Sequence, residues 1–413
     1  MASKEPERKV KKTAKKSAKR AVKAAKKHPS LVIAIVIILV IVIAVGVVLY
    51  FKVDTVHDFV DSLFKVEQNS SVGGNDPPRA GTYGDKDLSF HFLELGNNYT
   101  GDSTYIKAGD VDILIDAGSR YDSADDIATY VDQYCTDGKL EYVIATHGHQ
   151  DHIAGFSDTN KSDGIFKRYE CGVIIDFALT NATSEVYNKY VAARDAEVAA
   201  GAKHYTAMDC VAERNGAQKT YQLGEGMSMT ILYQYYYDHT ATDENDYSVC
   251  VLFNHGDNYY LLTGDLEEPG EASLVQENNL PEVQLFKAGH HGSYSATTNA
   301  LLSVIKPKIV CVCCCAGSIE YTKTKNNHTF PAQEFIDRVA PYTDKVYVTT
   351  VGSVQFNDTK NKYEDVGFAS MNGNITVLSS GGNVTVTCSN NNTLLKDTEW
   401  FSQNRTRPPA WAA

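Results

Sequence analysis

The hydrophobic positions of this chain fall into short runs, either alternating with polar residues or apolar throughout, and both patterns are typical of β-strands. Longer stretches with apolar residues three or four positions apart lie between them and predict helices. A hairpin is indicated at 247–265, where two apolar runs flank the turn HGDN. The other predicted strands are 88–95, 103–107, 111–118, 140–145, 171–177, 227–234, 282–289 and 308–317, and the predicted helices are 123–135, 184–201 and 331–342.

Strands interspersed with helices over some 300 positions predict one α/β domain built in layers. A stretch rich in Gly, Pro, Ser and Asn, residues 69–82, ends a juxtamembrane segment and linker that we place at 52–82. The layered domain follows at 83–388. Residues 389–413 lack strand alternation and form a C-terminal tail that either wraps the surface or stays loose.

An uninterrupted apolar run at 31–51 contains 21 uncharged residues. About 20 such residues span a bilayer as a helix, whereas the apolar core of a cleaved signal peptide has about 7–15. No cleavage site of small residues follows, so the run predicts a transmembrane signal anchor. Lys and Arg crowd its N-terminal side, so the positive-inside rule predicts a basic cytoplasmic tail at 1–30 and an extracellular domain.

The charge of the chain is unevenly distributed. The net charge is −12, but residues 1–30 carry twelve Lys or Arg and two Glu, so residues 31–413 carry −22. We expect the basic tail to set the orientation of the chain in the membrane and to be attracted to anionic lipid. Its Lys/Ala spacing also resembles nucleic-acid-binding tails. The acidic remainder has no dense basic cluster of the kind that follows a nucleic-acid backbone.

Candidate chemistry begins where the predicted strand 140–145 ends, in the motif THGHQDH. His147 and His149 are two positions apart and can turn toward one cation, while Asp151 and His152 are adjacent and face another way. Imidazole and carboxylate together suit zinc and related first-row metals. We therefore predict that all four side chains are metal ligands.

Further candidate ligands follow other predicted strands. Asp265 ends the run LLTGD, and its carboxylate can bridge two metal ions. His290 and His291 follow EVQLFKAG, and we expect one to be a ligand and the other to face substrate, with His290 favoured as the ligand. Asp116 ends VDILID, where it can hydrogen-bond a ligating histidine and set its tautomer.

The order DILIDAG, THGHQDHIAG, LLTGDLE and KAGHHGS resembles the metallo-β-lactamase superfamily over residues 86–350. The resemblance implies an αββα four-layer sandwich that binds two divalent metal ions. Zn²⁺ is the expected metal, and Mn²⁺ is the alternative. By motif, His147, His149 and Asp265 would hold the first ion. The second would be held by Asp151, His152, Asp265 and one of His290 or His291.

This sequence departs from the family pattern because no clear ligand histidine lies between the first motif and Asp265. It reads DENDYSVCVLF there and later NNHTFPAQEFIDRV, which is similar to the ComEC-type competence hydrolase domain. In that branch His328 would lie near the substrate, and Asp151, His291 and His328 are the predicted catalytic residues. The order of motifs also resembles that of a teichoic-acid phosphorylcholine esterase.

Both precedents imply phosphodiester hydrolysis by a metal-activated hydroxide but differ in substrate, and the acidic charge of the chain favours a small or surface-bound phosphodiester. Ser293 and Lys287 are candidates to contact phosphate, although a salt bridge is the simpler role for Lys287. The alternatives are a nuclease acting on DNA, which the acidic charge disfavours, and a lactonase, esterase or β-lactam hydrolase. A binding module with a degraded site is disfavoured by the intact ligand set. The oligomeric state stays open.

The nine cysteines need a separate explanation. Cys311, Cys313 and Cys315 alternate with Val312 and Cys314 in a predicted strand, so three of the four cysteines share one face. The run has no CxxC spacing, and we expect these residues to be small buried hydrophobes. An odd number of cysteines is unusual for a domain in an oxidising exterior.

Overall fold

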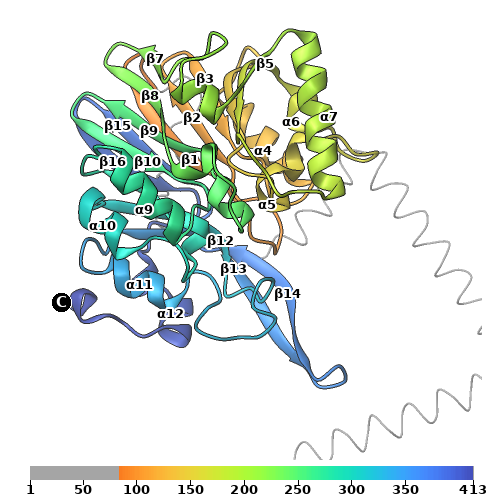
Figure 1. The fold of residues 1–413 in the computed structure, drawn as a ribbon. Coiled ribbons are helices and arrows are strands. Elements are labelled where there is room, and N and C mark those ends of the chain that lie inside the picture. Colours follow the sequence, from red (N-terminus) through yellow and green to blue (C-terminus); the bar gives the residue numbers. More distant parts are fainter. Residues whose placement is uncertain (1–82, 413) are drawn as a thin grey trace, which may run out of the picture. The chain divides into compact units, whose positions relative to one another are not determined.

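The computed structural model describes residues 83–412, which form two eight-stranded sheets with helices on their outer faces (Figure 1). The first sheet has the strand order β16-β15-β1-β2-β3-β4-β5-β6. Its strands are β1 (Leu88–Phe92), β2 (Thr104–Ala108), β3 (Val111–Ile115), β4 (Lys139–Ile144), β5 (Glu170–Asp176), β6 (Lys203–Thr206), β15 (Ile375–Ser380) and β16 (Asn383–Cys388).

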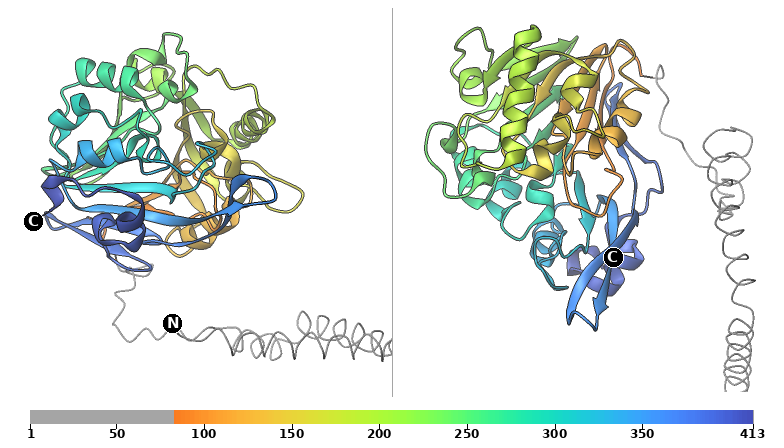
Figure 2. Two further views of the ribbon diagram at one scale, coloured as in Figure 1. Left: turned by 90° about the horizontal axis from the view of Figure 1, so that it is seen from below. Right: turned by 90° about the vertical axis from the view of Figure 1, so that its right-hand side faces the viewer.

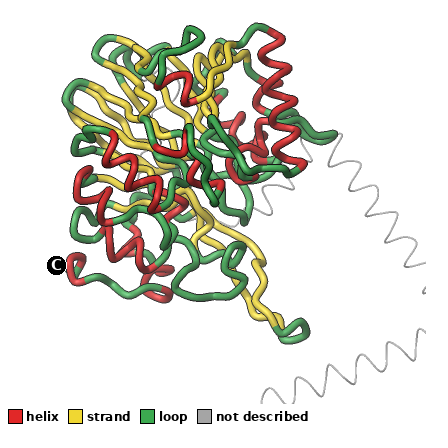
Figure 3. Tube along the Cα trace, viewed as in Figure 1, coloured by secondary structure: helices red, strands yellow, loops and turns green. Residues whose placement is uncertain are grey.

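The second sheet has the order β14-β13-β12-β11-β10-β9-β8-β7, so the chain fills each sheet mainly from one half of the sequence. At one edge of this sheet, β13 and β14 form a long hairpin that projects from the body of the domain (Figures 1 and 3). The strands are β7 (Thr220–Gly224), β8 (Met227–Leu232), β9 (Cys250–His255), β10 (Asn258–Leu262), β11 (Leu285–Lys287), β12 (Ile309–Ala316), β13 (Val346–Asn357) and β14 (Lys362–Ser370).

The helices divide between the two outer faces, as the views in Figures 1 and 2 show. The first group lies along the chain between β3 and β7, and the second lies after β10. The first group is α4 (Ser123–Val131), α5 (Gln150–Ile153), α6 (Ile165–Arg168), α7 (Glu185–Ala200) and α8 (Ala207–Val211), and the second is α9 (Glu268–Glu277), α10 (Asn299–Ile305), α11 (Gln333–Val339) and α12 (Glu399–Asn404).

The core between the sheets is aromatic where their centres face each other. The Phe90 ring of β1 lies 5.3 Å from the Phe253 ring of β9 and 4.7 Å from the Tyr260 ring of β10, measured between centroids. All three side chains are fully buried. The predicted sandwich of two sheets with outer helices is confirmed, because the alternating runs each bury one face against the facing sheet.

Local sequence signals explain where the predicted elements begin and end. The long helix α7 begins after Ser184, whose Oγ accepts a hydrogen bond from the Tyr187 backbone N at 3.1 Å. It ends at Gly201, whose φ of 128° favours glycine. The hairpin predicted around HGDN is formed by β9 and β10, which pair antiparallel.

The nine cysteines are all buried and unpaired. Cys311 and Cys313 pack in the core between the sheets, and Cys314 packs in the outer cluster, as the alternation predicted. A β-bulge between Val312 and Cys315 shifts the register of β12 against β13 and interrupts the alternation there. These thiols therefore serve as small hydrophobic side chains.

The parallel strands determine where functional side chains gather. In the first sheet β3, β4, β5 and β6 run parallel, and in the second β10, β11, β12 and β13 do so. Loops that leave the carboxyl ends of parallel strands meet at one edge of a sheet. The segments after β3, β4, β10 and β11 carry most of the candidate ligands predicted from the sequence.

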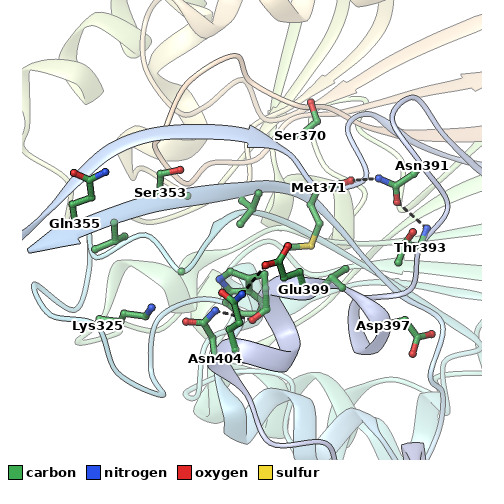
Figure 4. Close-up of a pocket in the computed structure, with 17 residues that line it drawn as sticks. Lys325, Ser353, Gln355, Ser370, Met371, Asn391, Thr393, Asp397, Glu399 and Asn404 are labelled. Carbon is green, nitrogen blue, oxygen red and sulfur yellow. Dashed lines mark hydrogen bonds between the residues drawn. The ribbon is translucent and has the colours of Figure 1, made fainter. Parts of the chain in front are cut away.

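The C-terminal segment after β16 packs on the domain. Leu395, Phe401 and Trp411 are buried in a cluster with the helix α11, and the Trp411 indole N donates to the Thr343 backbone O at 2.9 Å. Together with the β13–β14 hairpin the segment lines an open pocket of about 730 Å³ (Figure 4). Side chains lining it include Lys325, Ser353, Gln355, Asn391, Asp397, Glu399 and Asn404.

Within residues 83–412 no helix combines the length and apolarity needed to cross a bilayer. The transmembrane anchor predicted at 31–51 lies outside the described residues, as do the basic tail and the linker. The anchor stays a prediction from the sequence.

We predict that Trp411→Ala lowers the free energy of unfolding by about 3–5 kcal/mol, because it removes a large buried side chain from the outer cluster. Urea unfolding of the purified chain measures the change. Phe356→Ala is the control, since its side chain is 48% exposed on the hairpin and its loss should change stability by about 0.5 kcal/mol or less. A change below about 1 kcal/mol for Trp411→Ala would show that the C-terminal segment contributes little to folding.

Candidate metal centre

Five candidate side chains converge where strands of both sheets end. Asp116 follows β3, His147 follows β4, Asp265 follows β10, and Lys287 and His291 end or follow β11. Their exposed fractions are between 0 and 2%. Strands of two different sheets thus deliver polar side chains to one buried place at the edge of the sandwich.

The carboxylate of Asp265 lies at the centre of this group. Its Oδ2 is 3.0 Å from His152 Nε2, 3.1 Å from His291 Nε2 and 4.0 Å from His290 Nε2. His291 Nε2 is also 3.3 Å from Oδ2 of Asp151. Two carboxylates and two buried imidazoles therefore point their ligand atoms at one small volume.

These residues fit a divalent metal ion. His291 Nε2 is buried and has no hydrogen-bond partner among the described residues, although two carboxylate oxygens lie near it. His152, Asp265, His291 and Asp102 each offer a ligand atom within 4.8 Å of the others. Imidazole nitrogen and carboxylate oxygen are the donors that zinc and similar cations accept.

Asp102 belongs to this cluster but approaches it from behind. Its carboxylate lies 3.4 Å from Nδ1 of His291 and 3.8 Å from Nδ1 of His152, on the opposite side of each ring from Asp265. It also forms an ion pair with the buried Lys287. Asp102 therefore balances the charge of Lys287 behind the two imidazoles, and we do not assign it as a ligand.

The two remaining histidines of the first motif lie beside this cluster. His147 Nε2 is 3.0 Å from His149 Nδ1, and the His147 ring centroid is 4.2 Å from that of His152. His147 is fully buried, whereas His149 is exposed. The alternate positions 147 and 149 thus bring two imidazoles together on the loop after β4.

Each inward-facing imidazole is held by an acceptor on its other nitrogen. Asp116 Oδ2 lies 2.7 Å from His152 Nδ1, as the sequence predicted, and Asp116 Oδ1 accepts from the Thr146 backbone N at 2.7 Å. His291 Nδ1 lies 2.8 Å from the Cys313 backbone O. Such contacts leave Nε2 free to bind a metal and fix the ring orientation.

The adjacent histidines correct one expectation from the sequence. We expected that only one of them faces the site, with His290 as the ligand. The structure places His291 deepest, against Asp151 and Asp265, yet His290 Nε2 also points toward Asp265. Both residues have left-handed backbone angles, with φ of 45° and 54°, and this sharp turn brings two neighbouring side chains to the same place.

The charges of the cluster favour cations. Burial alone raises the pKa of the Asp265 carboxyl, but His152, His291 and Lys287 hold it well below its usual value, so the group is ionised. Burial lowers the pKa of Lys287, but Asp102 and Asp265 raise it above its usual value. Burial, His152 and His149 lower the pKa of His147, which keeps it neutral as a metal ligand must be.

The loop that carries His147 and His149 is held by a residue that sequence reasoning missed. Oε1 of Glu244 accepts from the Gly148 backbone N at 2.9 Å and Oε2 accepts from the Asn181 backbone N at 2.5 Å. A Cβ atom at position 148 would lie 2.6 Å from Glu244 Oε1, so glycine permits this approach. The acidic run DEND gave no sign of which carboxylate turns inward.

Ser248 stands in the same segment, where the family pattern led us to look for a histidine. Its Oγ accepts from the Asp265 backbone N at 3.1 Å and lies 3.4 Å from His147 Nδ1. It joins the loop after β4 to the loop after β10. Ser248 therefore positions ligands from both sheets without supplying one.

Three candidates for substrate contact are each engaged by other residues of the domain. The His328 side chain is 49% exposed, pairs with Glu334 at 3.3 Å and lies against the tilted ring of Tyr294, and the structure does not bring it to the candidate ligands. The Ser293 hydroxyl is buried and bonds to Ser295 at 2.9 Å. Lys287 forms the buried salt bridge that was the simpler expectation for it.

Residues 96–158 match the family model of the Metallo-beta-lactamase superfamily. A segment of 122 residues is 30% identical to Recombination protein 2 of Haemophilus influenzae, covering 29% of this chain and 14% of that protein's length.

Solved structures with similarity include the metallo-beta-lactamase fold protein YhfI from Bacillus subtilis. It is 14% identical, with 49% of this chain and 70% of that chain covered and a TM-score of 0.28. Another is MEM-A1, a subclass B3 metallo-beta-lactamase from a soil metagenome library. It is 15% identical, with 52% and 81% of the two chains covered and a TM-score of 0.31.

The two-sheet sandwich and the buried cluster of imidazole and carboxylate groups are what the resemblance to the metallo-β-lactamase superfamily led us to expect, and residues 96–158 match the model of that family. The predicted resemblance to its ComEC-type branch is confirmed by the likeness to Recombination protein 2.

We predict that Glu244→Gln weakens the binding of one metal ion by about 10- to 100-fold, because the amide cannot accept from both loops that the carboxylate holds. Titration of the metal-free chain with zinc against a competing chelating dye measures both sites. The matched control is Glu225→Gln, since this exposed carboxylate pairs only with Lys86. Equal zinc affinities for the two variants would contradict the positioning role.

Proposed function

We propose that this chain is a membrane-anchored phosphodiesterase that uses two divalent metal ions, with Zn²⁺ as the first candidate. The observation that carries the proposal is the position of Asp265 Oδ2, within 4.0 Å of imidazole nitrogens from both sheets. A carboxylate shared in this way can serve two cations. When bound, such a pair activates water and neutralises negative charge on a phosphate group.

We assign the second ion to Asp151, His152, Asp265 and His291, whose ligand atoms already converge. For the first ion we propose His147, His149, Asp265 and His290. The role of His290 is supported by Glu267, whose Oε1 lies 2.9 Å from His290 Nδ1 and leaves Nε2 facing Asp265. His290 thereby takes the place of the histidine that the family pattern lacks here.

The protein's own groups prepare this place for chemistry. Asp116, Cys313 and Glu267 fix three imidazoles through their Nδ1 atoms, so little reorganisation is needed when cations bind. The inner ligands are buried, while His149 is exposed and marks the side open to solvent. Substrate therefore approaches from the side of the loop after β4.

The net charge of the chain bears on which of two substrate classes, a small or surface-bound phosphodiester or a long nucleic acid, it would accept. Residues 31–413 carry a net charge of −22, and this supports a small or surface-bound phosphodiester over a long nucleic acid. A nuclease is the second candidate, favoured by the similarity to Recombination protein 2 over 122 residues. The predicted anchor at 31–51 supports action at the outer face of the cell membrane.

We predict that the zinc-loaded chain hydrolyses a generic aryl phosphodiester or an aryl phosphorylcholine, and that Asp151→Ala lowers kcat/KM by about 10³-fold or more. Release of the coloured phenol is measured, with single-stranded DNA and a β-lactam assayed alongside. Cleavage of DNA alone would establish the nuclease instead. Lactam turnover without turnover of any phosphodiester would contradict the proposal.

Paired substitutions test the ligand assignment. His147→Ala and His290→Ala should each leave one tightly bound ion, and the variant with both should also keep one, since both residues serve the same ion. The variant with His147→Ala and His291→Ala should lose both ions. Metal analysis after gel filtration gives the stoichiometry. Loss of both ions from the His147/His290 variant would show that His290 belongs to the other site.

A further inference from the structure

A loop between β12 and α11, residues 317–332, reaches the candidate metal centre from outside. The Tyr321 hydroxyl donates a hydrogen bond to Oδ2 of Asp151 at 2.5 Å. The same carboxylate oxygen is 3.3 Å from His291 Nε2, so the phenol lies directly beside the proposed ligands. Nevertheless, Tyr321 is 47% exposed, which places it between the buried cluster and solvent.

Several contacts from different parts of the domain hold this loop in place. Glu320, the neighbour of Tyr321, accepts from Arg120 Nη2 at 2.5 Å and from the Thr100 backbone N at 3.0 Å. The Ile319 backbone N donates to Asp365 of β14 at 3.2 Å. The position of the phenol is therefore set by residues from both sheets and does not depend on Asp151 alone.

An aromatic contact fixes the ring on its other side. The Phe330 ring lies 5.3 Å from the Tyr321 ring, 5.6 Å from the His290 ring and 5.8 Å from the His291 ring, measured between centroids. Phe330 thus fills the space between the phenol and the two histidines. The Tyr321 side chain is therefore held between the Phe330 ring and the Asp151 carboxylate.

The chemistry of a phenol suits the recognition of a phosphate oxygen. The hydroxyl is an uncharged donor, so it can approach an anionic oxygen without changing the charge of the site. With the Asp151 carboxylate committed to a cation, the hydroxyl would be free to donate its proton to an anionic substrate oxygen bound beside it. A hydrogen bond to a charged acceptor is stronger than a neutral one.

We propose that Tyr321 binds substrate, donating a hydrogen bond to a phosphate oxygen of the phosphodiester held at the metal centre. The inference rests on the proposed phosphodiesterase function and adds a substrate-contacting residue to it. The alternative is that Tyr321 only positions Asp151 as a ligand, in which case its hydroxyl would matter for metal binding and not for phosphate.

The test compares Tyr321→Phe with Tyr235→Phe in the full-length, zinc-loaded chain. Tyr235 is a matched control because it is 46% exposed and stacks on His239, away from the proposed ligands. Three quantities are measured: zinc content, the Kd of inorganic phosphate by calorimetry, and kcat/KM for the aryl phosphodiester. Because Tyr321 is exposed and phenylalanine lacks only its hydroxyl, we expect the variant to fold normally. The thermal midpoint checks this expectation.

We expect Tyr321→Phe to keep both zinc ions and the wild-type thermal midpoint, to bind phosphate about 10- to 100-fold more weakly, and to lose kcat/KM by a similar factor. Tyr235→Phe should match the wild type in all three measurements. Unchanged phosphate affinity, or loss of zinc that accounts for the lower activity, would overturn the proposal. If the wild type cleaves no phosphodiester, the proposed function fails, while the phosphate titration still decides the role of Tyr321.

Discussion

The buried carboxylate of Asp265 is the group around which the two sheets are organised. Burying a charge is costly unless it is paired, and here His152 from the first sheet and His291 and Lys287 from the second all approach it. These contacts tie the edges of the sheets together at the same point that the proposed function requires. The structure therefore concentrates charge where strand ends meet and leaves the interior between the sheets to Phe90, Phe253 and Tyr260.

Around this carboxylate, positive and negative groups are arranged in layers. Asp151 and Asp265 face the Nε2 atom of His291, while Asp102 and the Cys313 carbonyl face its Nδ1 atom. Each imidazole is thereby held between a partner that orients it and the space where a cation fits. Lys287 balances the extra carboxylate of Asp102. The cluster combines the requirements of folding and of metal binding, because the same contacts serve both.

The departure from the family pattern has a structural explanation. The segment that would carry the missing histidine instead supplies Glu244, which holds the first loop, and Ser248, which links it to Asp265. The turn after β11 has two successive left-handed residues, and both of its histidines reach toward Asp265. The unusual backbone of this turn thus brings a second imidazole near Asp265.

The residue pattern by itself determined the layered α/β domain, the hairpin at HGDN and the partnership of Asp116 with a histidine, whereas the two-sheet sandwich was expected from the resemblance to the metallo-β-lactamase superfamily. Those inferences rest on local signals, namely apolar periodicity, turn residues and dense motifs at strand ends, which act over short stretches of chain. The tertiary structure alone decided which of His290 and His291 lies deepest, because the answer depends on backbone angles that two identical residues do not reveal. It also decided that Asp102, Glu244 and Tyr321 lie beside the ligands and that His328 lies apart. These residues come from loops, where position is set by contacts with distant parts of the chain and not by a repeating pattern.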